Sequence, residues 1–531
     1  MRKNLIRALS KRSSSHHVSR EVQSSSSDES RKFRMFKWTA ISSGLAAFYY
    51  LHERSKTEAL SKEEILFTAD EVSKHNSLES LWVSYKGKVY DVTEFAQAHP
   101  GGAKNLLLAA GKDLAPFWGL YQQHSADHVQ EILARYCIGK LDPKSVKKSC
   151  LKSDKNTAYS NEPERHPAMK INNPTPFNGE PPPSLLLRSF ITPNELHFIR
   201  NRLPVPEVDI ATFTLDVSLP NGNVLPLSID ELKEKFEVIE MPVTLMCAGN
   251  RRSEFNAQVK DKKVNGLSWG QCAISTARWK GVLLTDILEH AGISYQECRA
   301  KGLVHLRVEG LDAGPDGVGT GASIPLERAF DRSSSVLVAF EMNGEEIPRD
   351  HGFPLRLVVP GTVGARNIKW LSKISVSAEE SESPTQRRDY KLFGPNVTNV
   401  KNIPWEQAPS VQYLPVTSAI LEPSTGTKGY AYSGAGNGIT RVDISVDGGQ
   451  TWTQTEIFNE NDPYTQKSFA WTLWNFELEI PEDIKEDKIE ICIRAIDSNC
   501  NTQPEKIDAL WNIRGLLNNS WHRIELFVTR Q

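Results

Sequence analysis

The sequence Val-Thr-Leu-Met-Cys-Ala-Gly-Asn-Arg-Arg, residues 243–252, contains the thiol of Cys247. The apolar residues before Cys247 favour a strand, and the Ala248-Gly249-Asn250 segment after it favours a tight turn. A thiolate is a soft ligand that suits a soft or high-valent metal, and adjacent guanidinium groups attract anions. A single cysteine beside a polar turn is more commonly a core residue, so other motifs must decide between the two interpretations.

The length and composition of the chain exclude several classes of protein. A chain of 531 residues is too long for one hydrophobic core and suggests about three domains. A hydrophobic fraction of 39% and a charged fraction of 24% are typical of a soluble globular protein. The net charge of -2 gives no indication of nucleic-acid binding, and seven cysteines without a Cys-x-x-Cys pair argue against a disulfide framework or a zinc ribbon.

The first 30 residues have the composition of a mitochondrial transit peptide, because six Lys and Arg residues precede the first acidic residue, Glu21. Residues 31–61 contain a charge-free run, 38–51, that is shorter than the roughly 17–25 residues of a membrane span. This run suits a cleaved sorting signal, so we expect the mature protein in the mitochondrial intermembrane space. A disordered basic tail and a retained membrane anchor are the alternatives.

Residues 62–141 predict a small independent module. Its strands are expected at 81–85 and 88–92, on either side of the turn signal Lys86-Gly87. Helices are expected at 103–111 and 125–136. The next 26 or so residues, 142–167, are rich in Lys, Ser, Asn and Pro and predict a flexible linker.

Residues 168–400 mix β-rich runs with helical stretches and predict a larger α+β domain. Strands are expected at 303–308 and 355–359, and a helix is expected at 279–290.

Residues 401–531 have an all-β pattern. Asp447-Gly448-Gly449 requires positive φ angles and indicates a hairpin. Residues 488–495 alternate between two faces, so we expect an immunoglobulin-like β-sandwich.

A second motif, His99-Pro-Gly-Gly102, follows the first predicted hairpin, and His124 lies 25 residues after His99. This layout resembles cytochrome b5, which implies haem b with His99 and His124 as axial ligands. His128 competes for the second position, and the family's spacing favours His124. Two axial ligands close the iron to substrate, so the haem is expected to carry electrons. The aromatic residues that either line this pocket or pack in the core are Phe117, Trp118 and Tyr121.

The motif at Cys247 resembles the molybdenum-ligand motif of the sulfite oxidase family, in its animal, mitochondrial type. The resemblance covers about residues 62–531. The further stretches that carry it are Phe198-Ile-Arg-Asn-Arg202, Gly310-Leu-Asp312, His351-Gly-Phe-Pro-Leu-Arg356, Gly364-Ala-Arg-Asn-Ile-Lys-Trp370, Arg387-Arg-Asp-Tyr390 and Trp511-Asn-Ile-Arg-Gly515. Cys272 lacks adjacent arginines, and we expect it to be a core residue.

The resemblance implies a molybdenum–pterin cofactor with Cys247 as the protein ligand of the metal. It implies that the residues around the cofactor are Phe198, Ile199, Arg200, Asn201, Arg202, Asp312, His351, Arg356, Asn367, Ile368 and Lys369. It implies that sulfite is bound by Arg200, Arg252, Trp269, Tyr390 and Arg514, and that Cys247, Tyr390 and Arg200 take part in catalysis. Each of these residues alone is more commonly a surface charge or an ordinary loop residue.

The implied activity is oxidation of sulfite to sulfate, with electrons passing singly through the haem to cytochrome c, in a homodimer formed by the all-β domain. One alternative is a plant-type nitrate reductase, in which the haem and flavin modules follow the molybdenum domain. Another is a haem electron-transfer or scaffold protein whose molybdenum domain is inactive. Thr320 stands where animal-type members often have a tyrosine, and the short stretch 422–429 puts an early hairpin of the all-β domain in doubt.

Overall fold

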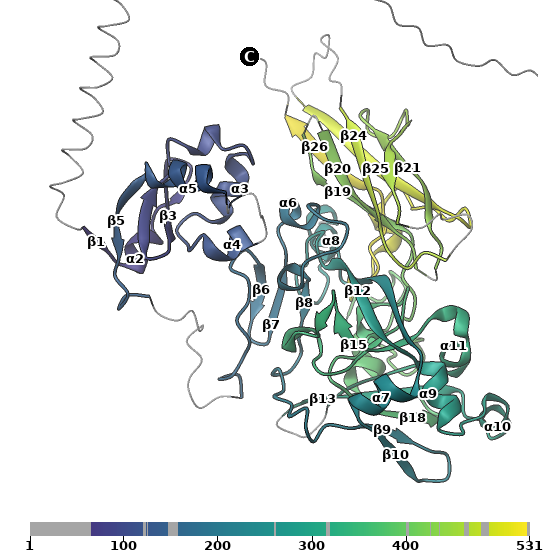
Figure 1. Ribbon diagram of the computed structural model, residues 1–531. Coiled ribbons are helices and arrows are strands. Elements are labelled where there is room, and N and C mark those ends of the chain that lie inside the picture. The colour runs from purple at the N-terminus through teal and green to yellow at the C-terminus, as the bar shows by residue number, and fades with distance from the viewer. Residues whose placement is uncertain are drawn as a thin grey trace, which may run out of the picture. The chain divides into compact units, whose positions relative to one another are not determined.

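The computed structural model describes residues 65–119, 124, 126–146, 158–259, 262–314, 319–399, 403–424, 426–434, 436–460, 467–478 and 488–527. The predicted transit peptide, the sorting segment up to residue 61 and Tyr121 lie outside these residues. Within the described ranges, no helix combines the length and the apolar character needed to span a bilayer. The predicted α+β class is confirmed, with a haem-type module, a mixed α+β domain and a β-sandwich (Figure 1).

The first module is a five-stranded sheet with short helices. In sheet order its strands are β1 (Leu66–Phe67), β5 (Cys137–Leu141), β4 (Lys88–Asp91), β3 (Ser80–Tyr85) and β2 (Asn76–Ser77). Its helices are α2 (Ala69–Val72), α3 (Ala103–Leu108), α4 (Ala115–Gly119) and α5 (Asp127–Ala134). The predicted hairpin is confirmed, because Lys86 and Gly87 both have positive φ, at 48° and 76°. The two predicted helices exist, but each is shorter than expected.

Three sheets build the large middle domain. The first has the order β10 (Val224–Leu227), β9 (Leu215–Ser218), β18 (Leu371–Ser377), β13 (His305–Ala313) and β14 (Gly319–Pro325). The second contains β11 (Val238–Met246), β12 (Ile274–Leu283), β15 (Leu337–Met342) and β16 (Glu345–Glu346), with β17 (Arg356–Val358) beside β15. The third contains β6 (Lys170–Pro174), β7 (Phe177–Glu180) and β8 (Ile199–Arg200).

Short helices connect these strands. They are α6 (Pro183–Leu186), α7 (Ile229–Lys235), α8 (Arg252–Gln258), α9 (Leu284–His290), α10 (Tyr295–Ala300) and α11 (Leu326–Phe330). Leu215, Ile287, Leu306 and Ile374 belong to one core cluster, and each is fully buried. The first sheet is therefore packed against α9.

The helix predicted at 279–290 is wrong in its first half. Residues up to Leu283 continue β12, and α9 begins only at Leu284. β12 pairs with β11 on one side and β15 on the other, and most of its side chains, including Trp279, are buried. A strand that is covered on both faces lacks apolar alternation, so its pattern resembles that of a buried helix. The strands predicted at 303–308 and 355–359 are confirmed by β13 and β17.

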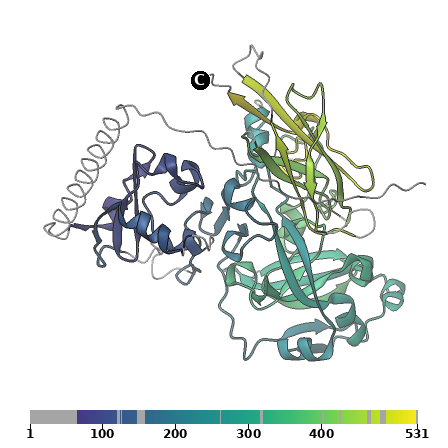
Figure 2. The ribbon, with the colours of Figure 1, turned by 45° about the horizontal axis from the view of Figure 1, so that its top comes forward.

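Two four-stranded sheets form the C-terminal sandwich (Figures 1 and 2). One contains β19 (Thr417–Glu422), β20 (Gly426–Tyr432), β24 (Thr472–Glu477) and β23 (Glu456–Phe458). The other contains β22 (Thr453–Gln454), β21 (Ile439–Ser445), β25 (Lys488–Asp497) and β26 (His522–Phe527). Gly448 and Gly449 have φ angles of 72° and 101°, as the predicted turn requires. β19 pairs antiparallel with β20, so the short stretch 422–429 does not remove that hairpin.

Candidate functional site

Cys247 lies directly after the last residue of β11, at the start of the turn that the sequence predicts. Its side chain is buried, and its sulfur accepts a hydrogen bond from the Gly249 N–H at 3.4 Å. The Cys247 N–H donates to the Ala273 carbonyl at 2.9 Å, which ties the turn to the segment that leads into β12. Arg251 follows with a φ of 64°, and this left-handed residue directs the chain into α8.

Residues of the C-terminal segment hold this turn from outside. The Leu517 N–H donates to the Ala248 carbonyl at 2.8 Å. The Asn518 side-chain amide donates to the Arg251 carbonyl at 3.1 Å. The position of the Cys247 thiol therefore depends on a part of the chain about 270 residues away in sequence.

Arg252 is buried directly behind the turn. Its guanidinium donates to the carbonyls of Gly515 and Leu267, both at 3.0 Å. A Cβ at Gly249 would lie 2.5 Å from this guanidinium, and one at Gly266 would lie 2.6 Å from it, so both glycines make room for the arginine. Burial lowers the pKa of Arg252, and the neighbouring Cys247 and Tyr390 partly offset that effect.

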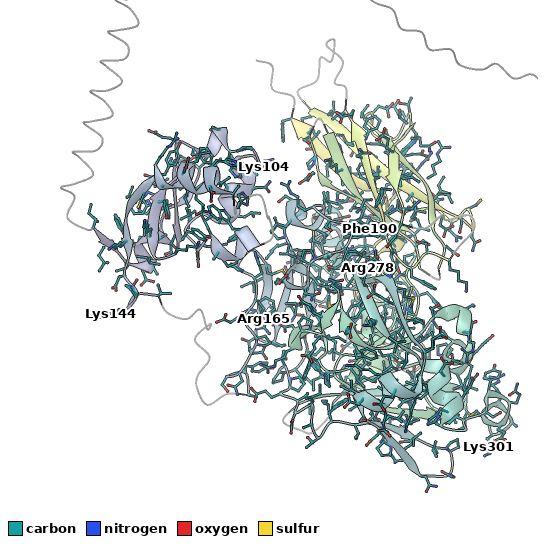
Figure 3. The ribbon with its side chains drawn as sticks, in the orientation of Figure 1. Lys104, Lys144, Arg165, Phe190, Arg278 and Lys301 are labelled. Carbon is teal, nitrogen blue, oxygen red and sulfur yellow. The ribbon has the colours of Figure 1, made fainter. Side chains whose placement is uncertain are left out.

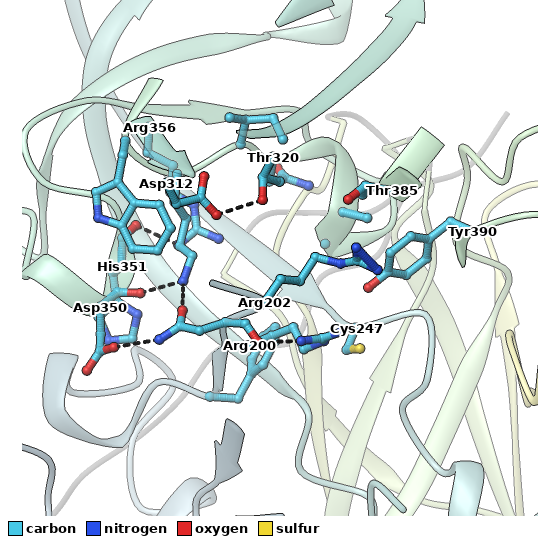
Figure 4. Close-up of a pocket in the computed structure, with 18 residues that line it drawn as sticks. Arg200, Arg202, Cys247, Asp312, Thr320, Asp350, His351, Arg356, Thr385 and Tyr390 are labelled. Atoms are coloured by element: carbon cyan, nitrogen blue, oxygen red, sulfur yellow. Dashed lines mark hydrogen bonds between the residues drawn. The ribbon is translucent and has the colours of Figure 1, made fainter. Parts of the chain in front are cut away.

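A pocket opens on the other side of the Cys247 turn (Figure 4). Most of the residues that the sequence predicts for the site line it. These are Phe198, Arg200, Asn201, Arg202, Cys247, Asp312, His351, Arg356, Asn367, Ile368, Lys369 and Tyr390. The four predicted residues that do not line this pocket are Ile199, Arg252, Trp269 and Arg514. Trp269 is fully buried in the same core cluster as Cys247.

Six further residues line the pocket, and none of them was predicted from the sequence as a site residue. They are Thr320, Asp350, Gly364, Ala365, Trp370 and Thr385. Thr320 was considered only as a departure from the family, yet its hydroxyl donates to the Asp312 carboxylate at 2.6 Å. Asp350 directly precedes His351, and this adjacency was the one available signal for it.

Asp389 is another residue whose role the sequence did not reveal. Its carboxylate pairs with Arg202 and accepts a hydrogen bond from Arg514 at 3.1 Å. Asp389 ends a short π-helical turn, Thr385–Asp389, that leads into Tyr390 (Figure 4 labels Tyr390 beside Arg202). Arg514, which comes from the C-terminal segment, is therefore held next to the pocket through Asp389.

The opposite end of the pocket is basic and buried. Burial lowers the pKa of Lys369 to about 7 and that of Arg356 to about 9. The Arg356 guanidinium donates to the His351 carbonyl at 2.9 Å, and His351 Nε2 lies 2.9 Å from the Asn194 carbonyl oxygen. Burial also lowers the pKa of His351 to about 3, so the imidazole is neutral and can donate from Nε2. Removal of water makes the charged forms of Lys369 and Arg356 costly unless an anion is bound near them.

Several buried polar atoms of this pocket have no hydrogen-bond partner among the described residues. They include Asp312 Oδ1, Arg202 Nε and Arg356 Nε. Burial raises the pKa of Asp312, and the Thr320 hydroxyl that donates to its other oxygen opposes this shift. Unpaired buried donors and acceptors cost about 1–3 kcal/mol each, so the pocket is suited to a ligand with an anionic group and with N–H donors. A pterin that carries a phosphate, bound next to a thiolate-ligated metal, has both features.

The small module brings together the two histidines predicted for haem. The rings of His99 and His124 lie 6.4 Å apart between centroids and are inclined by 9°. Two metal–imidazole bonds of roughly 2 Å each, added to the two ring radii, account for this separation. Burial, and then the nearby His99, lowers the pKa of His124, which favours the neutral imidazole that a metal requires. Trp118 stacks on His124 at 5.3 Å, whereas Phe117 is a core residue.

Three family models match consecutive parts of the chain. They are the cytochrome b5-like haem/steroid binding domain at 68–142, the oxidoreductase molybdopterin binding domain at 202–385, and the Mo-co oxidoreductase dimerisation domain at 407–529. Together with the geometry above, they define a molybdopterin-dependent oxidoreductase that carries its own haem module. Its cofactors are a molybdenum–molybdopterin centre and haem b.

Similar proteins narrow this class further. The chain is 46% identical to the mitochondrial sulfite oxidase of Rattus norvegicus, over 94% of this chain and 91% of that protein. It is also 46% identical to the mitochondrial sulfite oxidase of Homo sapiens, over 92% of this chain and 89% of that protein. Among solved structures, the sulfane dehydrogenase SoxCD from Paracoccus pantotrophus matches with a TM-score of 0.53 and 25% identity, over 66% of this chain and 84% of that one. The chain belongs to the sulfite oxidase family.

Proposed function

We propose that the protein oxidises sulfite to sulfate at a molybdenum–pterin centre and passes the electrons singly through its haem to cytochrome c. The observation that carries the proposal is a buried thiol, Cys247, on the wall of a pocket lined by basic side chains. The thiolate provides a soft metal ligand, and the basic wall attracts a small anion. When bound, the cofactor supplies the oxygen-atom transfer and the two-electron oxidation, which side chains cannot perform.

The chain's own residues would hold the cofactor at three places. Cys247 would ligate molybdenum, and the Gly249 N–H bond to its sulfur would stabilise the thiolate. Asp312, whose Oδ1 is unpaired among the described residues, would accept N–H groups of the pterin ring. The anionic end of the pterin would be bound by the basic group around Lys369 and Arg356, where an anion would restore the charged forms that burial disfavours.

Sulfite would be bound near Cys247 by Arg200, which lines the pocket. Arg252 and Arg514 lie behind this wall, and their charges would add to the attraction because a buried site screens them weakly. The phenol of Tyr390 lines the same pocket and can donate a hydrogen bond to the substrate or move a proton. Trp269 would support the Cys247 region from the core rather than contact the substrate.

The haem module would connect a two-electron oxidation to a one-electron acceptor. Ligation by both His99 and His124 would leave no open position on the iron, which suits electron transfer. The dimerisation domain at 407–529 supports a homodimer, and the mitochondrial relatives support a mitochondrial location. Within that organelle, the intermembrane space is where the predicted sorting signal would leave the protein and where cytochrome c is the expected acceptor.

The test is a comparison of wild-type protein with Cys247→Ser. Purified wild-type protein should contain about one molybdenum and one iron per chain and should reduce cytochrome c when sulfite is added. The serine variant should keep its haem absorption but lose sulfite oxidation, because an alcohol is a harder ligand than a thiolate. Cys272→Ser is the matched control, because Cys272 is equally buried but does not line the pocket. Near-normal turnover of Cys247→Ser would remove this thiol from the metal site.

A further inference from the structure

The last ten residues of the predicted linker, 158–167, contain a side chain that reaches the cofactor pocket indirectly. The guanidinium of Arg165 pairs with both oxygens of Asp350, at 2.8 and 2.9 Å, and it also contacts Glu162 (Figure 3 labels Arg165). It lies over the ring of Phe177, with its central carbon 4.3 Å from the ring centroid. The side chains of Arg165 and Asp350 are only 9% and 6% exposed, so water cannot replace this ion pair. Glu162 in turn accepts the Val205 N–H at 2.9 Å.

Asp350 continues the connection to the wall of the pocket. One of its carboxylate oxygens accepts a hydrogen bond from the Asn201 side chain at 2.9 Å, and its carbonyl accepts one from Lys369 Nζ at 2.8 Å. Lys369 Nζ also donates to the Asn201 side-chain oxygen. Figure 4 draws these hydrogen bonds around Asp350. Asn201 and Lys369 both line the pocket, whereas Arg165 does not.

We propose that Arg165 is a positioning residue for the anionic end of the molybdenum–pterin cofactor. The inference rests on the proposed function, because it assumes that Lys369 and Asn201 bind that end. A buried carboxylate must be neutralised by some cation. Arg165 neutralises Asp350 from outside, so the ammonium of Lys369 remains available to the cofactor. Without Arg165, the Asp350 carboxylate would turn towards Lys369 and compete with the cofactor for it.

The experiment compares Arg165→Gln with the double variant Arg165→Gln/Asp350→Asn. Haem-loaded full-length proteins are incubated and desalted at intervals, and molybdenum and the fluorescence of oxidised pterin are measured per haem. Arg165→Gln should lose cofactor at least about tenfold faster than wild type, a difference of about 1.4 kcal/mol. The double variant has no carboxylate at position 350 to compete for Lys369, so its rate should return to within about threefold of the wild-type rate.

Arg332→Gln is the matched control. It removes a guanidinium that pairs with Asp286 and Glu289 in the same domain, and none of these three residues lines the pocket, so the variant should lose cofactor at the wild-type rate. A purely structural role for Arg165 predicts the reverse order, in which the double variant is as poor as the single one or worse. That order, or an unchanged rate in Arg165→Gln, would overturn the inference. If Arg165→Gln cannot be purified with haem, the test rests on the double variant alone. Loss of cofactor from the double variant about tenfold faster than from wild type would then contradict the proposal. Wild-type protein without molybdenum would instead refute the proposed function itself.

Discussion

At the scale of single residues, Arg514 shows how far sequence position and spatial position can differ. It follows Asp312 by about 200 positions, yet its guanidinium reaches Asp389, which also pairs with Arg202 at the pocket. Burial lowers the pKa of Arg514, and the nearby Tyr390 opposes this effect. A positive charge held at such a place should strengthen the binding of a small anion.

Arg514→Met is therefore expected to raise the KM for sulfite and to weaken inhibition by sulfate. Arg514 does not line the pocket, so its charge acts on the anion through the field rather than through a direct hydrogen bond, and kcat/KM should fall by roughly one order of magnitude, about 1.4 kcal/mol. Steady-state kinetics with cytochrome c, with and without added sulfate, measure both effects. Arg494→Met is the matched control, because Arg494 pairs with Asp443 in the β-sandwich. Unchanged KM and sulfate inhibition in Arg514→Met would show that the C-terminal segment takes no part in anion binding.

The choice between His124 and His128 is a second question at this scale. His124→Ala should lose the low-spin absorption spectrum of a bis-imidazole haem, because its ring is the one that faces His99 at 6.4 Å. Cytochrome c reduction should then collapse, while sulfite oxidation with ferricyanide can persist by direct electron withdrawal from molybdenum. His128→Ala should behave like wild type in all three measurements. The opposite result for the two variants would reassign the axial ligand.

At the scale of elements, turns that a few adjacent residues determine could be predicted from the sequence, whereas the packing of a strand against distant parts of the chain could not. The turns at Lys86-Gly87 and Asp447-Gly448-Gly449 need positive φ angles, which a few adjacent residues determine, and both hairpins were predicted. β12 was misread over 279–283 because its side chains pack in two different core clusters, one with Trp279 and the other with Val282, and the sequence does not show which residues cover them.

The residues of the candidate site fall into the same two groups, those that the local sequence predicts and those that it does not. Cys247 and the basic residues that line the pocket were predicted from contiguous motifs that resemble a known family. Asp350, Asp389 and Arg165 were not assigned, because each acts through partners far away in sequence. Residues that belong to a contiguous motif can thus be predicted from one sequence, whereas the residues that hold them in place become visible only in the folded chain.

The junction between α8 and β26 carries a prediction about pH. His522, in β26, is buried; its Nδ1 accepts the Ile420 N–H at 3.1 Å, and its Nε2 lies 3.6 Å from Glu254 in α8. Burial lowers the pKa of His522 to about 4, with Glu254 opposing and Arg251 reinforcing that shift. A neutral His522 therefore favours the folded state at neutral pH. Below the unfolded pKa of about 6.5, the unfolded chain takes up a proton that the folded chain does not, so stability should fall between about pH 6.5 and 4.

The size of this effect should be roughly 3 kcal/mol, because each pKa unit corresponds to about 1.4 kcal/mol. Denaturant unfolding of wild type and His522→Gln across this pH range measures it. The glutamine variant should start less stable at pH 7 and should lose less stability on acidification. Parallel pH profiles for the two proteins would show that His522 is not the group responsible.

At the scale of the whole molecule, the haem module and the molybdenum domain are joined by a chain segment whose sequence predicts a flexible linker. Part of this segment behaves differently from that prediction. Glu162 and Arg165 bind to residues of the molybdenum domain, so residues 158–167 are attached to that domain. At the other end of the segment, the Asp142 N–H donates to the Phe67 carbonyl at 2.8 Å and the Ser145 hydroxyl accepts the Ala69 N–H at 2.8 Å, so residues 142–146 are attached to the haem module. The length that remains for a tether is 147–157, and a flexible chain of that length has a root-mean-square reach of roughly 18 Å.

Shortening the 147–157 stretch by half should therefore slow electron transfer from molybdenum to haem more than it changes sulfite binding. A shorter tether restricts the positions that the haem module can reach, whereas the anion pocket is built entirely from residues after 197. Flash photolysis gives the intramolecular rate, and the KM for sulfite measured with ferricyanide reports on the pocket. A Gly/Ser replacement of equal length is the control, and it should keep the wild-type rate because reach depends mainly on length. If the shortened protein transfers electrons at the wild-type rate, the haem module works from one fixed position and the tether has no role in turnover.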